Sequence, residues 1–94
     1  MKTFYLTLFL DQENYKFISS LHSTREAAEQ RCMELMKHFV LEGKPVPPKE
    51  DWICICDDCG EAPHVYEIRL DDGEAEEIDC QDKILADLST ADAN

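Results

Sequence analysis

The residues of this sequence best suited to chemistry are cysteines and a histidine in its second half. Cys56 and Cys59 are separated by two residues, Gly60 follows them, and His64 and Cys80 come later in the chain. A CxxC turn can hold two thiolates on one tetrahedral zinc ion, and a histidine and a third cysteine would complete the ligand set. The spacing therefore raises a structural zinc site as one interpretation.

The first three positions of this set resemble a retroviral-type zinc knuckle. A knuckle needs a further cysteine where this chain has Arg69, and its surroundings are basic, whereas these are acidic. The chain also lacks the second CxxC of many zinc sites. We therefore favour reduced cysteines packed as small apolar side chains, with no metal or other cofactor bound.

Catalytic chemistry finds little support in the sequence. A redox CxxC usually opens a helix in a thioredoxin-like unit, whereas this one follows an expected strand. The carboxylates of Asp57, Asp58 and Glu61 should disfavour a thiolate there. The three histidines lie outside GxSxG or HExxH contexts, and the three glycines form no phosphate-binding loop. We predict no catalytic residues and a protein that is not an enzyme.

A β-hairpin over residues 3–19 is expected at the start of the chain. Phe4, Leu6, Leu8 and Leu10 alternate with a second row that includes threonines. This period of two is typical of a strand with one side in the core. A turn-forming stretch and a second alternating run complete the hairpin.

A helix over residues 24–42 is expected next. Ser23 and Glu26 have the spacing of a capping box. Apolar residues then recur at helical spacing as far as Gly43, which suits a C-terminal cap. Three prolines within residues 44–49 prevent a helix or a central strand, so this segment is predicted to be a stiff linker.

The turn between the last two expected strands determines which residues face each other. A two-residue loop pairs Tyr66 with Asp79, whereas a three-residue loop closed by a glycine bulge pairs Tyr66 with Ile78. We prefer the second register because it joins two apolar side chains. It also sets His64 opposite Cys80.

The predicted fold is α+β: an antiparallel sheet of four or five strands with one main helix packed on one face. Residues 1–94 form a single domain, in which an acidic β-meander over residues 52–80 and a short helical tail over residues 81–94 follow the linker. The predicted core residues are Phe4, Leu6, Leu8, Phe17, Ala28, Cys32, Leu35, Phe39, Ile53, Ile55, Tyr66 and Ile68.

Charge separates the two halves of the chain. The 94 residues include 9 Lys and Arg against 21 Asp and Glu, a net charge of -12. Residues 50–94 hold fifteen of these acids and two basic residues, whereas residues 1–49 are nearly neutral. This charge excludes direct binding of nucleic acid or of an anionic membrane through a basic patch. A hydrophobic fraction of 44% excludes a disordered acidic tail.

The acids of the second half are the candidate partner-binding residues. Residues on one face of a strand recur every ~6.6–7 Å, a regular spacing of anions that a phosphate-binding groove could accept. The candidates are Asp57, Asp58, Asp71, Asp72, Glu74, Glu76, Glu77 and Asp79.

The predicted compartment is the cytoplasm of a host cell. The apolar run at residues 3–10 is interrupted by threonine and is not followed by a small-residue cleavage site, unlike a signal peptide. Five cysteines, an odd number, favour reduced thiols over a disulfide framework. No run approaches the ~20 apolar residues that span a bilayer.

In size, acidity, cysteine usage and lack of catalytic motifs, the chain resembles the small anti-CRISPR and antirestriction-type inhibitors of phages and mobile elements. The resemblance implies a non-catalytic inhibitor that binds a basic nucleic-acid-handling protein, such as a CRISPR-Cas effector complex. Such a DNA mimic would block access of target DNA with its acidic surface. Two alternatives remain: a small zinc-stabilised adaptor, and a protein-docking module that uses the helix or Trp52 and other aromatic residues.

Overall fold

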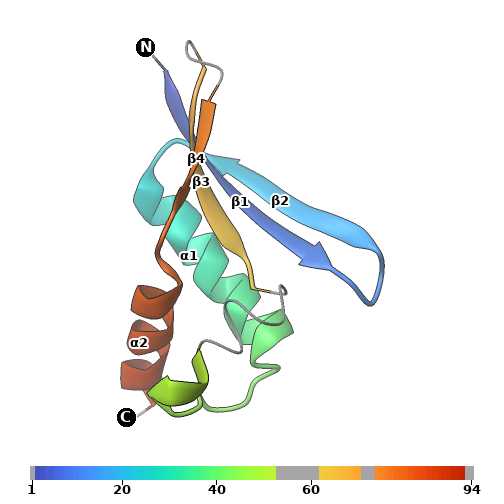
Figure 1. Ribbon diagram of the computed structural model, residues 1–94, viewed down its shortest axis with the longest axis vertical. Helices are drawn as coiled ribbons and strands as arrows, with labels where there is room; N and C mark the ends of the chain where they lie inside the picture. Colours follow the sequence, from blue (N-terminus) through green and yellow to red (C-terminus); the bar gives the residue numbers. More distant parts are fainter. Residues whose placement is uncertain (1, 53–61, 71–73, 93–94) are drawn as a thin grey trace.

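A computed structural model of the chain describes residues 2–52, 62–70 and 74–92 (Figure 1). Four antiparallel strands form one sheet in the order β2-β1-β3-β4, and two helices pack on one side of it. The elements are β1 (Thr3–Asp11), β2 (Lys16–His22), α1 (Arg25–Leu35), β3 (His64–Arg69), β4 (Glu74–Ile78) and α2 (Gln81–Asp92). The predicted α+β class with an antiparallel sheet is confirmed.

The hairpin of β1 and β2 extends to His22, beyond the expected limit at residue 19. Asp11 closes its turn by accepting a hydrogen bond of 2.8 Å from Asn14 Nδ2, a contact that lowers the pKa of the Asp11 carboxyl. Tyr15 completes the turn with a φ of 53°, a left-handed conformation. The turn therefore has a side-chain contact that fixes it locally.

Helix α1 begins one residue later than the capping-box spacing predicts. Thr24 is extended and its hydroxyl accepts a 3.2 Å hydrogen bond from the amide of Ala27, so Thr24 and not Ser23 is the N-cap. After Leu35 the helix continues as a π-helical turn, Met36–Val40. The C-cap is Leu41, and the next two residues, Glu42 and Gly43, take left-handed φ values of 53° and 78°, so Gly43 lies one residue beyond the position where glycine commonly ends a helix.

The register predicted for the last hairpin is wrong. Val65 pairs with Ile78 and Tyr66 with Glu77, around a loop of four residues rather than three. This register places Val65 and Ile78 together on the side of the sheet that the helices cover, and it leaves Tyr66 on the other side. The register was predicted from cross-strand pairing of Tyr66 with an apolar residue alone. That prediction left out the stabilisation gained by burying Val65 and Ile78 under the helices.

The core lies between the helices and the covered side of the sheet. Ala28, Cys32 and Leu35 of α1 are buried, which confirms three of the predicted core residues. Helix α2, expected only as a short tail, contributes three more buried apolar side chains, Ile84, Leu85 and Leu88. The residues of the main core cluster are Ala28, Cys32, Met36, Leu41, Ala62, Val65, Cys80, Ile84, Leu85 and Leu88.

Several predicted core residues instead lie on the side of the sheet opposite the helices, which we call the open face. Phe17 is 67% exposed there, so its assignment to the core is wrong. Five others are only partly buried and lie on the same face: Phe4, Leu6, Leu8, Tyr66 and Ile68. Phe39 is half-buried against Phe9, with ring centroids 5.1 Å apart. Ile53 and Ile55 lie outside the described residues.

The helices cover the row of β1 that contains Thr7 and Phe9, because α1 approaches the strand closely on that side. Thr7 is fully buried and its hydroxyl donates a 2.7 Å hydrogen bond to the carbonyl of Ala28. The small Ala28 side chain, also fully buried, permits this short contact. In the described part of the chain, no helix is long and apolar enough to span a membrane.

Candidate interaction surface

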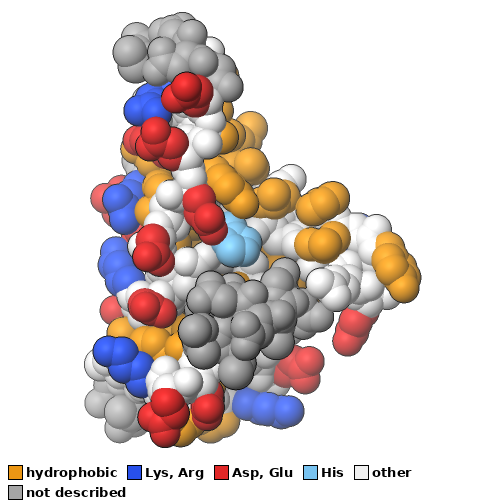
Figure 2. All heavy atoms as spheres, viewed as in Figure 1, with side chains coloured by type: hydrophobic (Ala, Val, Ile, Leu, Met, Phe, Trp, Pro, Cys, Tyr) orange, Lys and Arg blue, Asp and Glu red, His pale blue; other side chains and the backbone are white. Residues whose placement is uncertain are grey.

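Four of the eight predicted partner-binding acids are described, and all four are exposed on or directly after the edge strand β4. These are Glu74, Glu76, Glu77 and Asp79. The other four, Asp57, Asp58, Asp71 and Asp72, lie outside the described residues. Charged side chains line the edge of the molecule where β4 and α2 run (Figure 2).

The acids of β4 lie on both sides of the sheet. Glu74 and Glu76 are on the helix-covered side, where Arg69 Nη2 lies 3.6 Å from Glu74 Oε2 and 2.7 Å from Glu76 Oε1. Glu67 lies directly opposite Glu76 on β3. Two carboxylates thus pair with one guanidinium, and this group of side chains keeps a net negative charge.

Glu77 lies on the open face, next to His64 and Tyr66. His64 Nδ1 is 2.5 Å from Glu77 Oε1 and 2.9 Å from Gln81 Nε2. Burial, and then the charge of Glu77, raise the pKa of Tyr66. Glu77 is therefore held at the boundary between the acidic edge and the apolar part of the open face.

The open face carries a continuous apolar surface across the sheet, which the sequence did not identify as a site. Its most exposed members are Phe17 and Leu21 of β2, at 67% and 68%, and Leu70, at 55%, which lines the same hollow as Leu21. The remaining apolar residues of this face are Phe4, Leu6, Leu8, Leu10, Tyr66, Ile68 and Ala75. In Figure 2, apolar side chains gather between the end of β3 and β4 and the β1–β2 hairpin. Exposed patches of this kind mark sites of association.

A hollow of about 350 Å³ lies within this face. Its lining is almost entirely apolar and joins three strands and their ends. The lining residues are Phe4, Leu21, His22, Ser23, Ile68 and Leu70. The signal that could have found it is the second apolar row of β1, since only one row could be covered by the helices.

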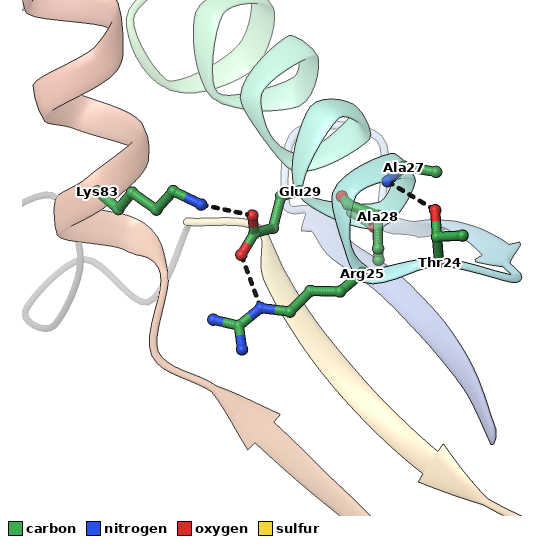
Figure 3. A network of polar contacts seen from close by, with 7 residues as sticks. Thr24, Arg25, Ala27, Ala28, Glu29 and Lys83 are labelled. Carbon is green, nitrogen blue, oxygen red and sulfur yellow. Dashed lines mark hydrogen bonds and ion pairs between the residues drawn. The ribbon is translucent and has the colours of Figure 1, made fainter.

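An ion-pair network holds the two helices together on the covered side (Figure 3). Glu29 of α1 accepts hydrogen bonds of 2.9 Å from Arg25 Nε and from Lys83 Nζ of α2. Burial favours the neutral form of Glu29, but the two cations outweigh this effect and lower the pKa of the carboxyl. The network fixes α2, and with it the residues that follow β4.

Of the four residues that the zinc alternative would use, the two that are described, Cys80 and His64, lie on opposite sides of the sheet. Cys80 is 1% exposed in the core, where a hydrogen bond with the Cys32 thiol lowers the pKa of Cys80. His64 lies on the open face, and the predicted pairing of His64 with Cys80 is wrong. Cys56 and Cys59 lie outside the described residues. Within the described part of the chain, no three His, Cys, Asp or Glu side chains form a metal-binding group.

One contact has the chemical form of a nucleophile and a base. Ser20 Oγ lies 2.7 Å from His22 Nε2 on β2. In a hydrolytic site a third group orients the imidazole and amides stabilise the oxyanion. Among the described residues, no carboxylate contacts the other nitrogen of His22, so this pair has no assembled hydrolytic site around it.

Comparison with known proteins adds no relative. No protein-family model, curated protein sequence or solved structure matches this chain.

Proposed function

We propose that this protein is a non-catalytic inhibitor that binds a basic nucleic-acid-handling protein of its host cell. A CRISPR-Cas effector complex is the partner that we expect. The protein would bind the Lys and Arg side chains that grip target DNA and so deny the DNA access. The observation that carries this proposal is the group of exposed carboxylates along the edge strand β4 and directly after it.

The distribution of charge among the described residues supports this surface. Residues 62–70 and 74–90 carry seven acidic and two basic side chains, whereas residues 2–52 carry eight and seven. Because both basic side chains of the C-terminal part are engaged by acids, they do not offer a partner free cations. A basic groove therefore meets an excess of negative charge at this edge.

The position of the acids on an edge strand also supports the proposal. The outer side of β4 has no neighbouring strand in the described sheet. A groove wide enough for nucleic acid could receive this edge with acids on both of its sides. Charge complementarity of this kind raises association rates and makes binding weaken with salt.

The test is competition between this protein and target DNA for purified CRISPR-Cas effector complexes, measured by fluorescence anisotropy of labelled DNA. The wild-type protein should displace DNA from at least one such complex. The variant E74Q/E76Q/E77Q/D79N removes four negative charges with little change in shape and should weaken displacement by about 10- to 100-fold. The difference between the wild-type protein and this variant in displacing DNA should become smaller as the salt concentration rises.

The matched control is E13Q/E42Q/E50Q/D51N, which changes the net charge equally through exposed acids outside β4. It should displace DNA nearly as well as the wild-type protein. Equal losses in the two variants would show that net charge alone acts, and no displacement by the wild-type protein would remove the proposed partner class.

The open face favours a second candidate, a docking module that binds another protein through apolar side chains. Its exposed phenylalanine and leucines would bind with little loss in high salt, unlike the acidic edge. The salt dependence of binding thus separates the two candidate functions.

A further inference from the structure

We infer that the open face is the interface of a homodimer, in which a second copy of this chain covers the apolar side of the sheet. This inference concerns a surface other than the acidic edge and does not depend on the proposed inhibition. Three properties of the face support a second copy: its charge, its size and its shape.

The charge of the face suits contact between two strongly acidic chains. Two copies with a net charge of -12 repel wherever their acidic surfaces meet. Among the strand residues of the open face, the only ionisable carboxylate is Glu77, which contacts His64 at the β4 border. A second copy on this face therefore meets mainly apolar side chains, with Glu77 at the β4 border of the contact.

The size of the face is that of a small, weak interface. Strands lie ~4.8 Å apart and rise ~3.4 Å per residue, so strands of 9, 7, 6 and 5 residues offer a footprint of about 440 Å². Two copies then bury about 900 Å² by footprint, close to the ~1,000 Å² that marks the lower limit for a specific interface.

The shape of the face is complementary to itself. Phe17 protrudes near one end of β2, and the apolar hollow lies at the other end, beside Leu21. A two-fold axis that crosses the strands near Ser19 carries Phe17 of each copy toward the hollow of the other. Both contacts then form at once, as an isologous interface requires.

The oligomeric state in solution tests this inference. Sedimentation velocity of the full chain from about 5 to 300 µM should show a reversible monomer–dimer equilibrium. Higher salt should leave the dimer unchanged or strengthen it, because salt screens repulsion between the copies. This response is opposite to that expected of the acidic edge, so failure of one proposal does not imply failure of the other.

The variant F17S/L21S should weaken the dimer at least ~30-fold without adding charge. Its matched control is Y15S, which removes an aromatic side chain that is 91% exposed in the neighbouring turn and should dimerise normally. Circular dichroism and thermal unfolding establish that each variant is folded. A wild-type protein that stays monomeric at every concentration, or a double variant that dimerises normally, overturns the inference.

The arrangement has its own measurement. In a mixture of isotope-labelled and unlabelled chains, filtered NOE spectra should show contacts from the Phe17 ring of one copy to the Leu21 methyl groups of the other. Their presence supports the two-fold arrangement. A dimer without them uses a different interface and overturns it.

Discussion

The two sides of the sheet receive different residues from the same strand and have different neighbours. Toward the helices, β1 presents Thr7 and Asp11, both nearly completely buried, together with Phe9. Toward the open face it presents only phenylalanine and leucine. The more apolar row of the strand is therefore the one that the helices leave uncovered.

This difference teaches that hydrophobicity alone does not decide which side of a sheet a helix covers. The close contact between Thr7 and Ala28 requires a small residue on the helix and a hydrogen-bonding group on the strand. Larger side chains would hold α1 further away. The covered side thus supplies stability, and the open face keeps apolar area for association.

The largest expected contrast between the two sides comes from one substitution made on each. Leu85→Ala removes a side chain that is fully buried in the core and should lower the free energy of unfolding by about 2–5 kcal/mol. Leu21→Ala makes the same change at a position that is 68% exposed and should cost under about 1 kcal/mol. Urea unfolding at low protein concentration, where the chain is monomeric, measures both. Similar losses would mean that the open face is part of the folding core.

The sequence was sufficient for the fold class and for the buried face of α1. Ala28, Cys32 and Leu35 recur at helical spacing, and no competing row of similar hydrophobicity exists on that helix. The end of the helical segment near Gly43 was equally predictable, because the φ of 78° at Gly43 suits glycine above other residues. Local rules suffice where one residue row or one backbone conformation has no rival.

The sequence was insufficient where two patterns compete. In β1 both rows contain apolar residues, so the period of two identified a strand but could not choose its covered side. In the last hairpin, loops of two and three residues were considered from the sequence, and neither gives the observed register, which depends on helices packed elsewhere in the chain. Burial of Val65 and Ile78 under the helices decided the register, which no local pairing rule could supply.

The candidate site was predicted in part for the same reason. Glu74, Glu76, Glu77 and Asp79 were identified by their charge alone, and exposed acids need no tertiary contact to be recognised. The apolar open face depends instead on which row of β1 remains uncovered.

A smaller effect on the covered side is expected from Glu29→Gln. The variant breaks the contacts from Arg25 and Lys83 and should cost about 1–2 kcal/mol at pH 7, because the Glu29 side chain is only 11% exposed. Glu34→Gln is the control: its pair with Arg31 lies on the surface, and its loss should cost under about 0.5 kcal/mol.

The pH dependence of Glu29→Gln follows from the lowered pKa of this carboxyl. Because the pKa is lower in the folded chain than its usual value of 4.5, the network contributes fully above that value. Its contribution is lost as the pH falls through the pKa of the folded state. The difference in the free energy of unfolding between wild type and Glu29→Gln, measured with urea, should therefore decrease as the pH is lowered from 5. A constant difference across this range would contradict the role of the charged carboxylate.

The smallest of these effects tests the contact that holds α1 on its side of the sheet. Thr7→Val keeps the shape of the side chain but removes the hydrogen bond to Ala28, and should cost about 1 kcal/mol. Thr3→Val is the matched control on the same row, at a position that is only partly buried, and should cost less. If the two substitutions have equal effects in urea unfolding, the hydroxyl of Thr7 does not help α1 to choose the less apolar row. Packing alone would then decide which side of β1 is covered by α1. The open face would stay uncovered only because the connection from β2 to α1 leads to the opposite side of the sheet.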